Sequence, residues 1–176
     1  MSGARAFPPA DLALELLERR HRRKVFSSGD RRVDDWLARR ALPAMRKNTS
    51  TTRVLAQADG TVAGYYTLAN TALDVSLVPA DLFHGERPRH PPPTLTLAWL
   101  GVDRRFSRRG LGSKLFARAL ADAVQAFETV RFVAVIVDAL TDANVVFYES
   151  QGFTRVPGTV NKLFLAASTL VEITKR

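Results

Sequence analysis

Two glycines beside a cluster of arginines, just after an apolar stretch, carry the clearest chemical signal in the sequence. Residues 94–102 (TLTLAWLGV) are largely apolar, and Gly110 and Gly112 follow them closely. The first N–H groups of a helix have no internal partner and carry the positive end of the helix dipole. Glycines there let a diphosphate approach the backbone, and arginines add positive charge. The segment therefore predicts an anion-binding turn between a buried strand and a helix. Its arginines are Arg104, Arg105, Arg108 and Arg109.

Two other phosphate-binding patterns are absent from the sequence. No Gly-x-x-x-x-Gly-Lys-Ser/Thr run occurs, which excludes a nucleoside-triphosphatase loop. The dinucleotide fingerprint needs a third glycine and an acidic residue about 20 positions later, and neither is correctly placed.

A second motif, ANVVFYESQGF over residues 143–153, contains a tyrosine that could act as an acid. Asn144 and Tyr148 are four residues apart and so share one face of a helix. Taken alone, Tyr148 is a core tyrosine with a satisfied hydroxyl. The helix, however, follows a buried strand, so its start is expected near the sheet edge where ligands of open α/β sheets bind.

Periodicity and turn signals predict the elements that position these motifs. Residues 12–17 suit either a strand or a helix, and the Asp59-Gly60 pair predicts a hairpin turn between residues 53–58 and 61–68. Residues 77–93 contain five prolines and predict a long loop. Helices are expected over residues 31–45, 110–127 and 142–150, the last ending at Gly152, and further strands over 94–102, 132–137, 154–156 and 162–166.

This order of elements predicts an α/β (α+β) fold with a mixed central sheet of about six to seven strands and helices on both faces. The 176 residues suit a single domain over 1–176, in which residues 1–10 are expected to be flexible.

Positive charge is concentrated in one part of the chain. The net charge is +9, and the stretch from Arg19 to Lys47 holds eleven basic and three acidic residues. Such a field favours a polyanionic partner, for example a nucleic acid or a phosphorylated cofactor. A solvated surface without a partner is an equally good interpretation of the charge alone.

The composition excludes several classes of site. The sequence has no cysteine, so disulfides, thiolate metal sites and cysteine nucleophiles are excluded. The histidines, His21, His84 and His90, do not have metal-ligand spacing, and no metal is expected. No run approaches a membrane span and no signal peptide is evident, so we expect a cytoplasmic protein without a membrane partner.

The two motifs, at this separation, resemble the GNAT superfamily of acetyl-coenzyme A-dependent N-acetyltransferases. In that family a Gln/Arg-x-x-Gly-x-Gly/Ala turn holds the coenzyme A pyrophosphate, and a later Phe-Tyr-x-x-x-Gly-Phe carries a tyrosine that protonates the departing thiolate. Gly110, Gly112, Tyr148, Gly152 and Phe153 match these patterns. The residue at the Gln/Arg position is Ser107, a departure that removes one expected contact unless Arg108 and Arg109 replace it.

The resemblance, which extends from about Leu12 to Leu165, implies a GNAT-like domain with acetyl-CoA as acetyl donor. It implies Tyr148 as the catalytic residue. The residues implied for cofactor binding are Leu100, Gly101, Val102, Ser107, Arg108, Arg109, Gly110, Leu111, Gly112, Ser113, Asn144 and Tyr148. No side chain stands out as general base; Asp103 and Glu149 qualify only by position, and we expect both at the surface.

Residues 26–37 (FSSGDRRVDDWL) and 59–69 (DGTVAGYYTLA) are similar to one GNAT branch, which contains the tRNA-acetylating toxins of bacterial toxin–antitoxin pairs. Those toxins often have Gly-Arg where this chain has Ala98 and Trp99. The branch implies an aminoacyl-tRNA acceptor, a ribbon-helix-helix antitoxin and a homodimer.

On this hypothesis the basic residues contact tRNA phosphates, with His90 beside the last two. They are Arg31, Arg32, Arg39, Arg40, Arg46, Lys47, Arg87 and Arg89. Two alternatives stay open: an acetyltransferase of a small amine or protein amino group, and a non-catalytic nucleic-acid-binding or regulatory module on the same fold.

Overall fold

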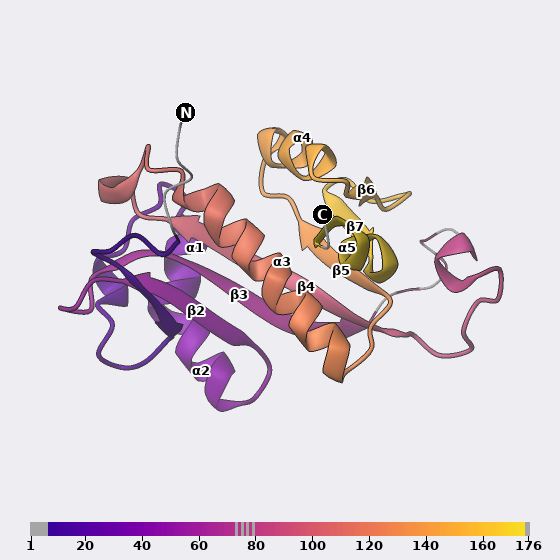
Figure 1. Ribbon diagram of the computed structural model, residues 1–176, viewed down its shortest axis with the longest axis horizontal. Helices are drawn as coiled ribbons and strands as arrows, with labels where there is room; N and C mark the ends of the chain where they lie inside the picture. Colours follow the sequence, from indigo (N-terminus) through magenta and orange to yellow (C-terminus); the bar gives the residue numbers. More distant parts are fainter. Residues whose placement is uncertain (1–6, 73, 75, 77, 79, 175–176) are drawn as a thin grey trace. The chain divides into compact units, whose positions relative to one another are not determined.

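Seven strands form a mixed sheet in the computed structural model, which describes residues 7–72, 74, 76, 78 and 80–174 (Figure 1). The strands are β1 (Ala13–Leu16), β2 (Thr51–Ala56), β3 (Val62–Ala72), β4 (Pro93–Val102), β5 (Ala134–Asp138), β6 (Thr154–Arg155) and β7 (Lys162–Ala166). Their order is β1-β2-β3-β4-β5-β7-β6, with β4 and β5 parallel. The predicted mixed sheet is confirmed.

Packing divides the described residues into two units. The first comprises the chain up to Leu68 together with Trp99–Ala119, and the second comprises Ala69–Ala98 together with the chain from Leu120 onward. Strands β3 and β4 and helix α3 (Leu111–Thr129) contribute residues to both units. Each unit is described by itself below.

In the first unit, β1 resolves the open prediction for residues 12–17 as a strand, because it pairs antiparallel with β2, Leu14 opposite Leu55. Strands β2 and β3 form the predicted hairpin. Its turn contains three residues, since the Gln57 amide donates to the Thr61 carbonyl at 2.9 Å. Only Gly60 of this turn has a positive φ, +83°, so the turn is a glycine-ended one and not the tight two-residue form expected from Asp-Gly.

The predicted helix over residues 31–45 is present as three joined segments: α1 (Arg31–Asp35), a π-helical turn (Trp36–Arg40) and α2 (Ala41–Arg46). Asp30 caps it by accepting a hydrogen bond from the Arg32 amide at 2.8 Å. Val33, Leu37 and Ala41 are buried at a spacing of four residues, while the basic residues stay on the outside. One apolar face therefore packs this segment against the rest of the unit, and its charged side chains face the solvent.

Helix α3 begins near the end of β4, as predicted, after a short 3-10 turn over Arg104–Phe106. A Cβ at Gly64 of β3 would lie 2.6 Å from the Leu115 Cδ1, so glycine is needed where the helix crosses this strand. Leu111 and Leu115 are buried there. The close approach fixes the first turns of α3 on the strands of this unit.

The second unit contains β5, β6, β7 and two further helices. Strand β7 pairs antiparallel with β5, and Val78, Ala134, Ile136, Val156 and Phe164 form a buried apolar cluster. Helix α4 (Asp142–Ser150) has the predicted bounds, begins at the N-cap Thr141 and is followed by Gly152 with φ +91°. Helix α5 (Ala167–Thr174) was not predicted from the sequence.

The predicted long loop over residues 77–93 contains a short 3-10 turn at Ala80–Phe83, while residues 77 and 79 lie outside the described residues. Residues 1–6 of the segment expected to be flexible also lie outside them. Within the described residues, no helix combines the length and apolarity that crossing a membrane would require.

Candidate active site

A cleft of about 400 Å³ opens between the end of β4 and the start of α3, in the first unit. It is lined by Ser28, Val102, Arg104, Phe106, Ser107, Arg108, Gly110, Leu111, Gly112 and Ser113. Seven of the predicted cofactor-binding residues are among them. Leu100 and Gly101 are not, and Gly101 faces the other way: a Cβ there would lie 2.5 Å from the Val33 side chain.

The backbone of the cleft suits an anion. Gly110 has φ +68°, and nothing lies within 4 Å of where its Cβ would be, so the backbone is open to a ligand. The Lys114 amide donates to the Gly110 carbonyl at 3.4 Å, a helical hydrogen bond between residues four apart. The amides of Leu111, Gly112 and Ser113 therefore precede the first such bond of α3, which is where helices bind phosphate.

Only two of the four arginines in this loop line the cleft, namely Arg104 and Arg108. Arg109 donates two hydrogen bonds to Asp11, at 2.8 and 3.1 Å, and the guanidinium lowers the pKa of that carboxyl. Arg109 is thus held by the segment before β1 and does not replace the glutamine or arginine missing at Ser107. Arg108, with φ +61°, is the side chain left for that contact.

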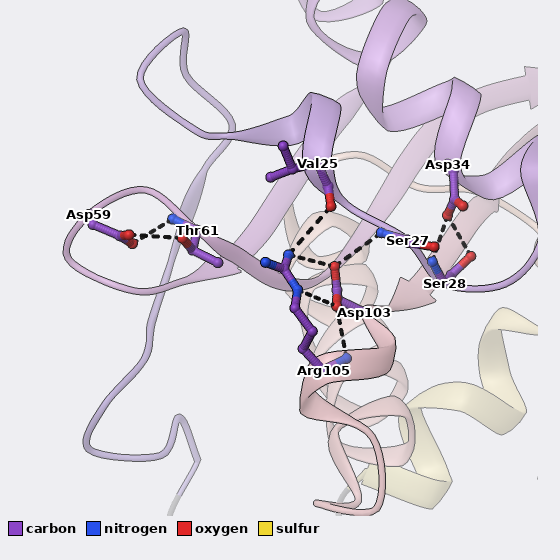
Figure 2. Close-up of polar contacts among 8 residues, drawn as sticks. All are labelled: Val25, Ser27, Ser28, Asp34, Asp59, Thr61, Asp103 and Arg105. Carbon is purple, nitrogen blue, oxygen red and sulfur yellow. Dashed lines mark hydrogen bonds and ion pairs between the residues drawn. The ribbon is translucent and has the colours of Figure 1, made fainter.

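Asp103 was expected at the surface, and this expectation is wrong: the side chain is only 1% exposed. Figure 2 shows it between Ser27 and Arg105, accepting hydrogen bonds from the Ser27 amide at 3.0 Å and from the Arg105 amide and Nε at 2.9 Å. In the reverse direction, the Arg104 amide donates to the Ser27 carbonyl at 2.9 Å. The carboxylate thereby joins the loop after β4 to the chain before α1.

Burial alone would raise the pKa of Asp103. The side-chain and backbone hydrogen bonds from Arg105, the bond from the Ser27 amide and the guanidinium charge together hold that pKa below its ordinary value. The carboxylate is therefore ionised at neutral pH. A buried anion that accepts from four N–H groups is a structural clamp and a poor general base.

Ser28, the cleft residue next to this clamp, is held by α1. Both its amide and its hydroxyl donate to Asp34 Oδ1 at 2.7 Å, as Figure 2 shows. The Arg104 guanidinium lies across neighbouring Gly29, where a Cβ would meet its Nη2 at 2.6 Å. Residues of the turn that precedes α1 thus form one wall of the cleft.

Replacing Asp103 by Asn is expected to destabilise the protein and to raise the KM for acetyl-CoA. The amide keeps the shape but presents an N–H where a donor now bonds, which costs about 1 to 3 kcal/mol. Since the folded-state pKa is lowered, the wild-type advantage is fully present above the unfolded pKa of about 4 and is lost progressively as pH falls from there through the lower folded-state pKa. Thermal unfolding at pH 7 and pH 3 measures this.

The matched control is Asp138→Asn, an exposed carboxylate paired with Lys162 at 2.8 Å. Such a pair contributes about 0 to 1 kcal/mol. Equal losses of unfolding temperature in the two variants at pH 7 would contradict the clamp.

Tyr148 lies on α4 in the second unit. It is half-buried, its ring is 5.5 Å from the Phe147 ring and 5.8 Å from the Phe153 ring, and burial raises the pKa of the phenol. The hydroxyl therefore carries its proton at neutral pH. Asn144, one turn earlier, is half-buried, and its Oδ1 accepts from the Thr141 hydroxyl at 3.0 Å. Glu149 is exposed and bound to Arg155 at 2.6 Å, as expected for a surface residue.

The residues predicted to contact RNA phosphates are exposed. In the first unit these are Arg31, Arg32, Arg39, Arg40, Arg46 and Lys47. Arg32 is bound to Asp30 at 2.6 Å, and Arg31 and Arg39 lie 3.7 and 3.8 Å from Asp35. In the second unit Arg87, Arg89 and His90 are exposed on the loop before β4. Acidic residues of the helix thus hold some of the arginines in place at the surface.

No group of three or more His, Cys, Asp or Glu side chains within the described residues is placed to hold a metal ion. His21 is buried; its Nδ1 accepts from the Glu18 amide at 2.8 Å, and its Nε2 bonds Glu15 at 2.9 Å. This histidine fixes the turn after β1.

Comparisons with known proteins point to one family. The model of the acetyltransferase (GNAT) family matches residues 12–153. A tRNA-acetylating toxin of Mycobacterium tuberculosis is 36% identical over 123 residues, 70% of this chain and 72% of the toxin. Two solved structures have the same fold: AtaT complexed with acetyl-methionyl-tRNAfMet (TM-score 0.82, 24% identity, covering 94% of this chain and 100% of that one) and AtaTR bound with acetyl-CoA (0.81, 25%, 93% and 98%).

The family match covers most of the chain and includes both the loop with Gly110 and Gly112 and the helix α4 with Tyr148. The chain belongs to the GNAT acetyltransferase family.

Proposed function

We propose that this protein transfers the acetyl group of acetyl-CoA to the amino group of an aminoacyl-tRNA and thereby blocks translation, as a toxin. The observation that carries the proposal is the glycine-lined cleft at the start of α3, in a chain 36% identical to a tRNA-acetylating toxin. The cleft supplies the backbone donors for a pyrophosphate, with Ser107, Arg108, Gly110 and Gly112 at its lining. It is the part of the site that we assign to the cofactor.

In the proposed reaction the free amine attacks the thioester carbonyl, the C–N bond forms and the C–S bond breaks. Backbone N–H groups over Leu100–Val102 are the donors that we assign to the developing oxyanion, a role worth about 3 kcal/mol. Tyr148 gives its proton to the departing sulfur, and its raised pKa supports that role because the acid must be protonated at the working pH. Asn144 shares its helix face.

A dedicated base is not needed in this scheme. The α-amino group of an aminoacyl ester has a reference pKa near 8, so roughly a tenth to a fifth of it is already neutral at physiological pH. Water can take the proton that the amine loses on attack. Asp103 is excluded as the base by its buried hydrogen bonds.

The exposed arginines of α1, the π-helical turn and α2 are assigned to the phosphates of the acceptor, with Arg87 and Arg89 as further contacts. We also propose that the chain acts as one acetyltransferase domain in the cytoplasm, as a homodimer, and that a ribbon-helix-helix antitoxin neutralises it. A solved neighbour, AtaT, is bound to the C-terminus of its antitoxin AtaR, which supports an antitoxin partner.

The test incubates the purified protein with radiolabelled acetyl-CoA and total bacterial aminoacyl-tRNA. Label in the RNA fraction that mild alkaline deacylation removes is the expected result, and mass analysis of the released amino acid identifies the acceptor. Release of coenzyme A only with small amines or peptides would point to an ordinary N-acetyltransferase. No turnover with any acceptor would point to a non-catalytic protein.

A further inference from the structure

The only two tryptophans of the chain stack on one another in the first unit. Trp36 opens the π-helical turn Trp36–Arg40 and Trp99 lies on β4; their ring centroids are 5.3 Å apart and the ring planes differ by 15°. Both side chains are half-buried. The two residues are 63 positions apart in the chain, and the fold of this unit brings them together.

Hydrogen bonds to two strand threonines fix the orientation of the pair. Trp36 Nε1 donates to the Thr67 hydroxyl at 3.1 Å, and the buried Thr67 shares a 2.8 Å hydrogen bond with the hydroxyl of Thr52. The two strand hydroxyls thus hold the indole ring of Trp36 rigidly. Trp99 is held by the ring against which it stacks.

The indole N–H of Trp99 is a donor for which the described part of the chain supplies no hydrogen-bond acceptor. Among the described residues no hydrogen bond reaches it, and it is not among the buried side-chain atoms that lack one, so it is accessible to solvent. An accessible donor at the edge of a rigid, half-buried aromatic pair is suited to a flat, polar-edged ligand.

The residues next to the tryptophan pair indicate which kind of ligand it binds. Arg39 and Arg40 project from the same π-helical turn as Trp36 and are exposed. Trp99 immediately precedes Leu100–Val102, the segment assigned to the acyl group, and one to three residues of strand span about 3 to 10 Å. An aromatic surface between arginines and an acyl-transfer site matches the end of a single-stranded nucleic acid, whose bases stack and whose phosphates are anionic.

We propose that the Trp36–Trp99 pair binds the unpaired base at the 3′ end of the acceptor RNA, with the base stacked on the indoles and the Trp99 N–H donating to it. This rests on the proposed function, because the aminoacyl group is esterified to that terminal nucleotide. The base is then held next to the amine that attacks, and the RNA end is positioned by stacking while Arg39 and Arg40 hold phosphates.

Tryptophan fluorescence tests the binding without any turnover. Because the chain has no other tryptophan, its emission reports on this pair alone. Saturating coenzyme A is added first, since it carries an adenine of its own, and the protein is then titrated with an unacylated RNA trinucleotide. We expect saturable quenching by the trinucleotide and little by the same strand with an abasic terminal ribose. Equal quenching by both strands overturns the proposal.

Kinetics of Trp99→Ala and Trp99→Phe test the role in the reaction. Loss of one base–aromatic stack is expected to raise the KM for aminoacyl-tRNA about 5- to 150-fold in Trp99→Ala, with a smaller rise in Trp99→Phe. The KM for acetyl-CoA stays unchanged, which also shows that the variant folds. A fall in kcat with an unchanged KM for the RNA overturns the proposal.

An aminoacyl ester without a nucleotide separates the base from the amino-acid side chain. We expect Trp99→Ala and the wild type to acetylate such an ester equally. If the variant loses as much on this ester as on tRNA, the amino-acid side chain occupies the pair and the proposal is wrong. If the wild type acetylates no aminoacyl-tRNA at all, the proposed function fails, while the fluorescence titration still decides whether the pair stacks a base.

Discussion

Tyr148→Phe is expected to lower kcat roughly 100- to 10,000-fold while leaving the affinity for acetyl-CoA nearly unchanged, because general acid catalysis supplies a factor of this size. The substitution removes one oxygen atom and keeps the ring that lies against Phe147 and Phe153. Single-turnover acetylation and calorimetric binding of acetyl-CoA measure the two effects separately. Equal losses in rate and in binding would show that the tyrosine is structural.

The chain supplies a matched control for this substitution. Tyr65 is fully buried and its hydroxyl donates to the Val33 carbonyl at 2.7 Å, and burial raises the pKa of its phenol as well. Tyr65→Phe should cost about 1 kcal/mol of stability through the lost hydrogen bond and leave kcat within a small factor. The pair of variants thus distinguishes a hydroxyl that supports the fold from one that transfers a proton.

Reversing the charge at Arg39 and Arg40 to Glu is expected to weaken tRNA binding about 60- to 200-fold at 50 mM salt, because each lost phosphate contact removes counterion release. The slope of log K against log salt should become shallower by about 1.5, and the two proteins should converge at high salt. Filter binding of tRNA across a salt series measures both quantities. Acetylation of a small amine acceptor is expected to be unaffected.

The control reverses an equal charge elsewhere. Arg131, which lies 4.4 Å from the centre of the Phe127 ring, and Lys162, paired with Asp138, both belong to the second unit. If Arg131→Glu together with Lys162→Glu weakens tRNA binding as much as the first pair, net charge governs the affinity and the helix surface is not the RNA site.

Local signals in the sequence were sufficient for most elements. The Asp59-Gly60 pair located the hairpin, and Gly152 located the end of α4, because both depend on backbone conformations that neighbouring residues determine. Helix α5 was missed since its threonines, valine and isoleucine favour strands, and burial of Ala167 and Leu170 overrides that preference. Of the residues that line the cleft, Gly110 and Gly112 were predicted from the local sequence pattern, Ser107 and Ser113 followed from the resemblance to the GNAT family, and Ser28 was not predicted.

The contacts that the sequence did not reveal join residues far apart in the chain. Asp103 carries no local sign of burial, because its donor Ser27 lies 76 residues earlier. The pairing of Arg109 with Asp11 and the stacking of Trp36 on Trp99 are equally distant from any motif. Periodicity describes which face of an element is apolar, and it contains no information on which side chain of another element will meet it.

The Arg109–Asp11 pair spans 98 residues, and the Ser27–Asp103 bond spans 76. Both contacts join residues far apart in the sequence. Each therefore forms late in folding, because the long chain segment between its two residues must first lose conformational freedom. During synthesis, a nascent chain that has not yet emerged as far as Arg109 lacks the parts that shape the cleft. Acetyl-CoA binding therefore requires that this unit has folded completely. The ligand stabilises the folded protein relative to incomplete nascent chains and partly folded states, because these lack the cleft.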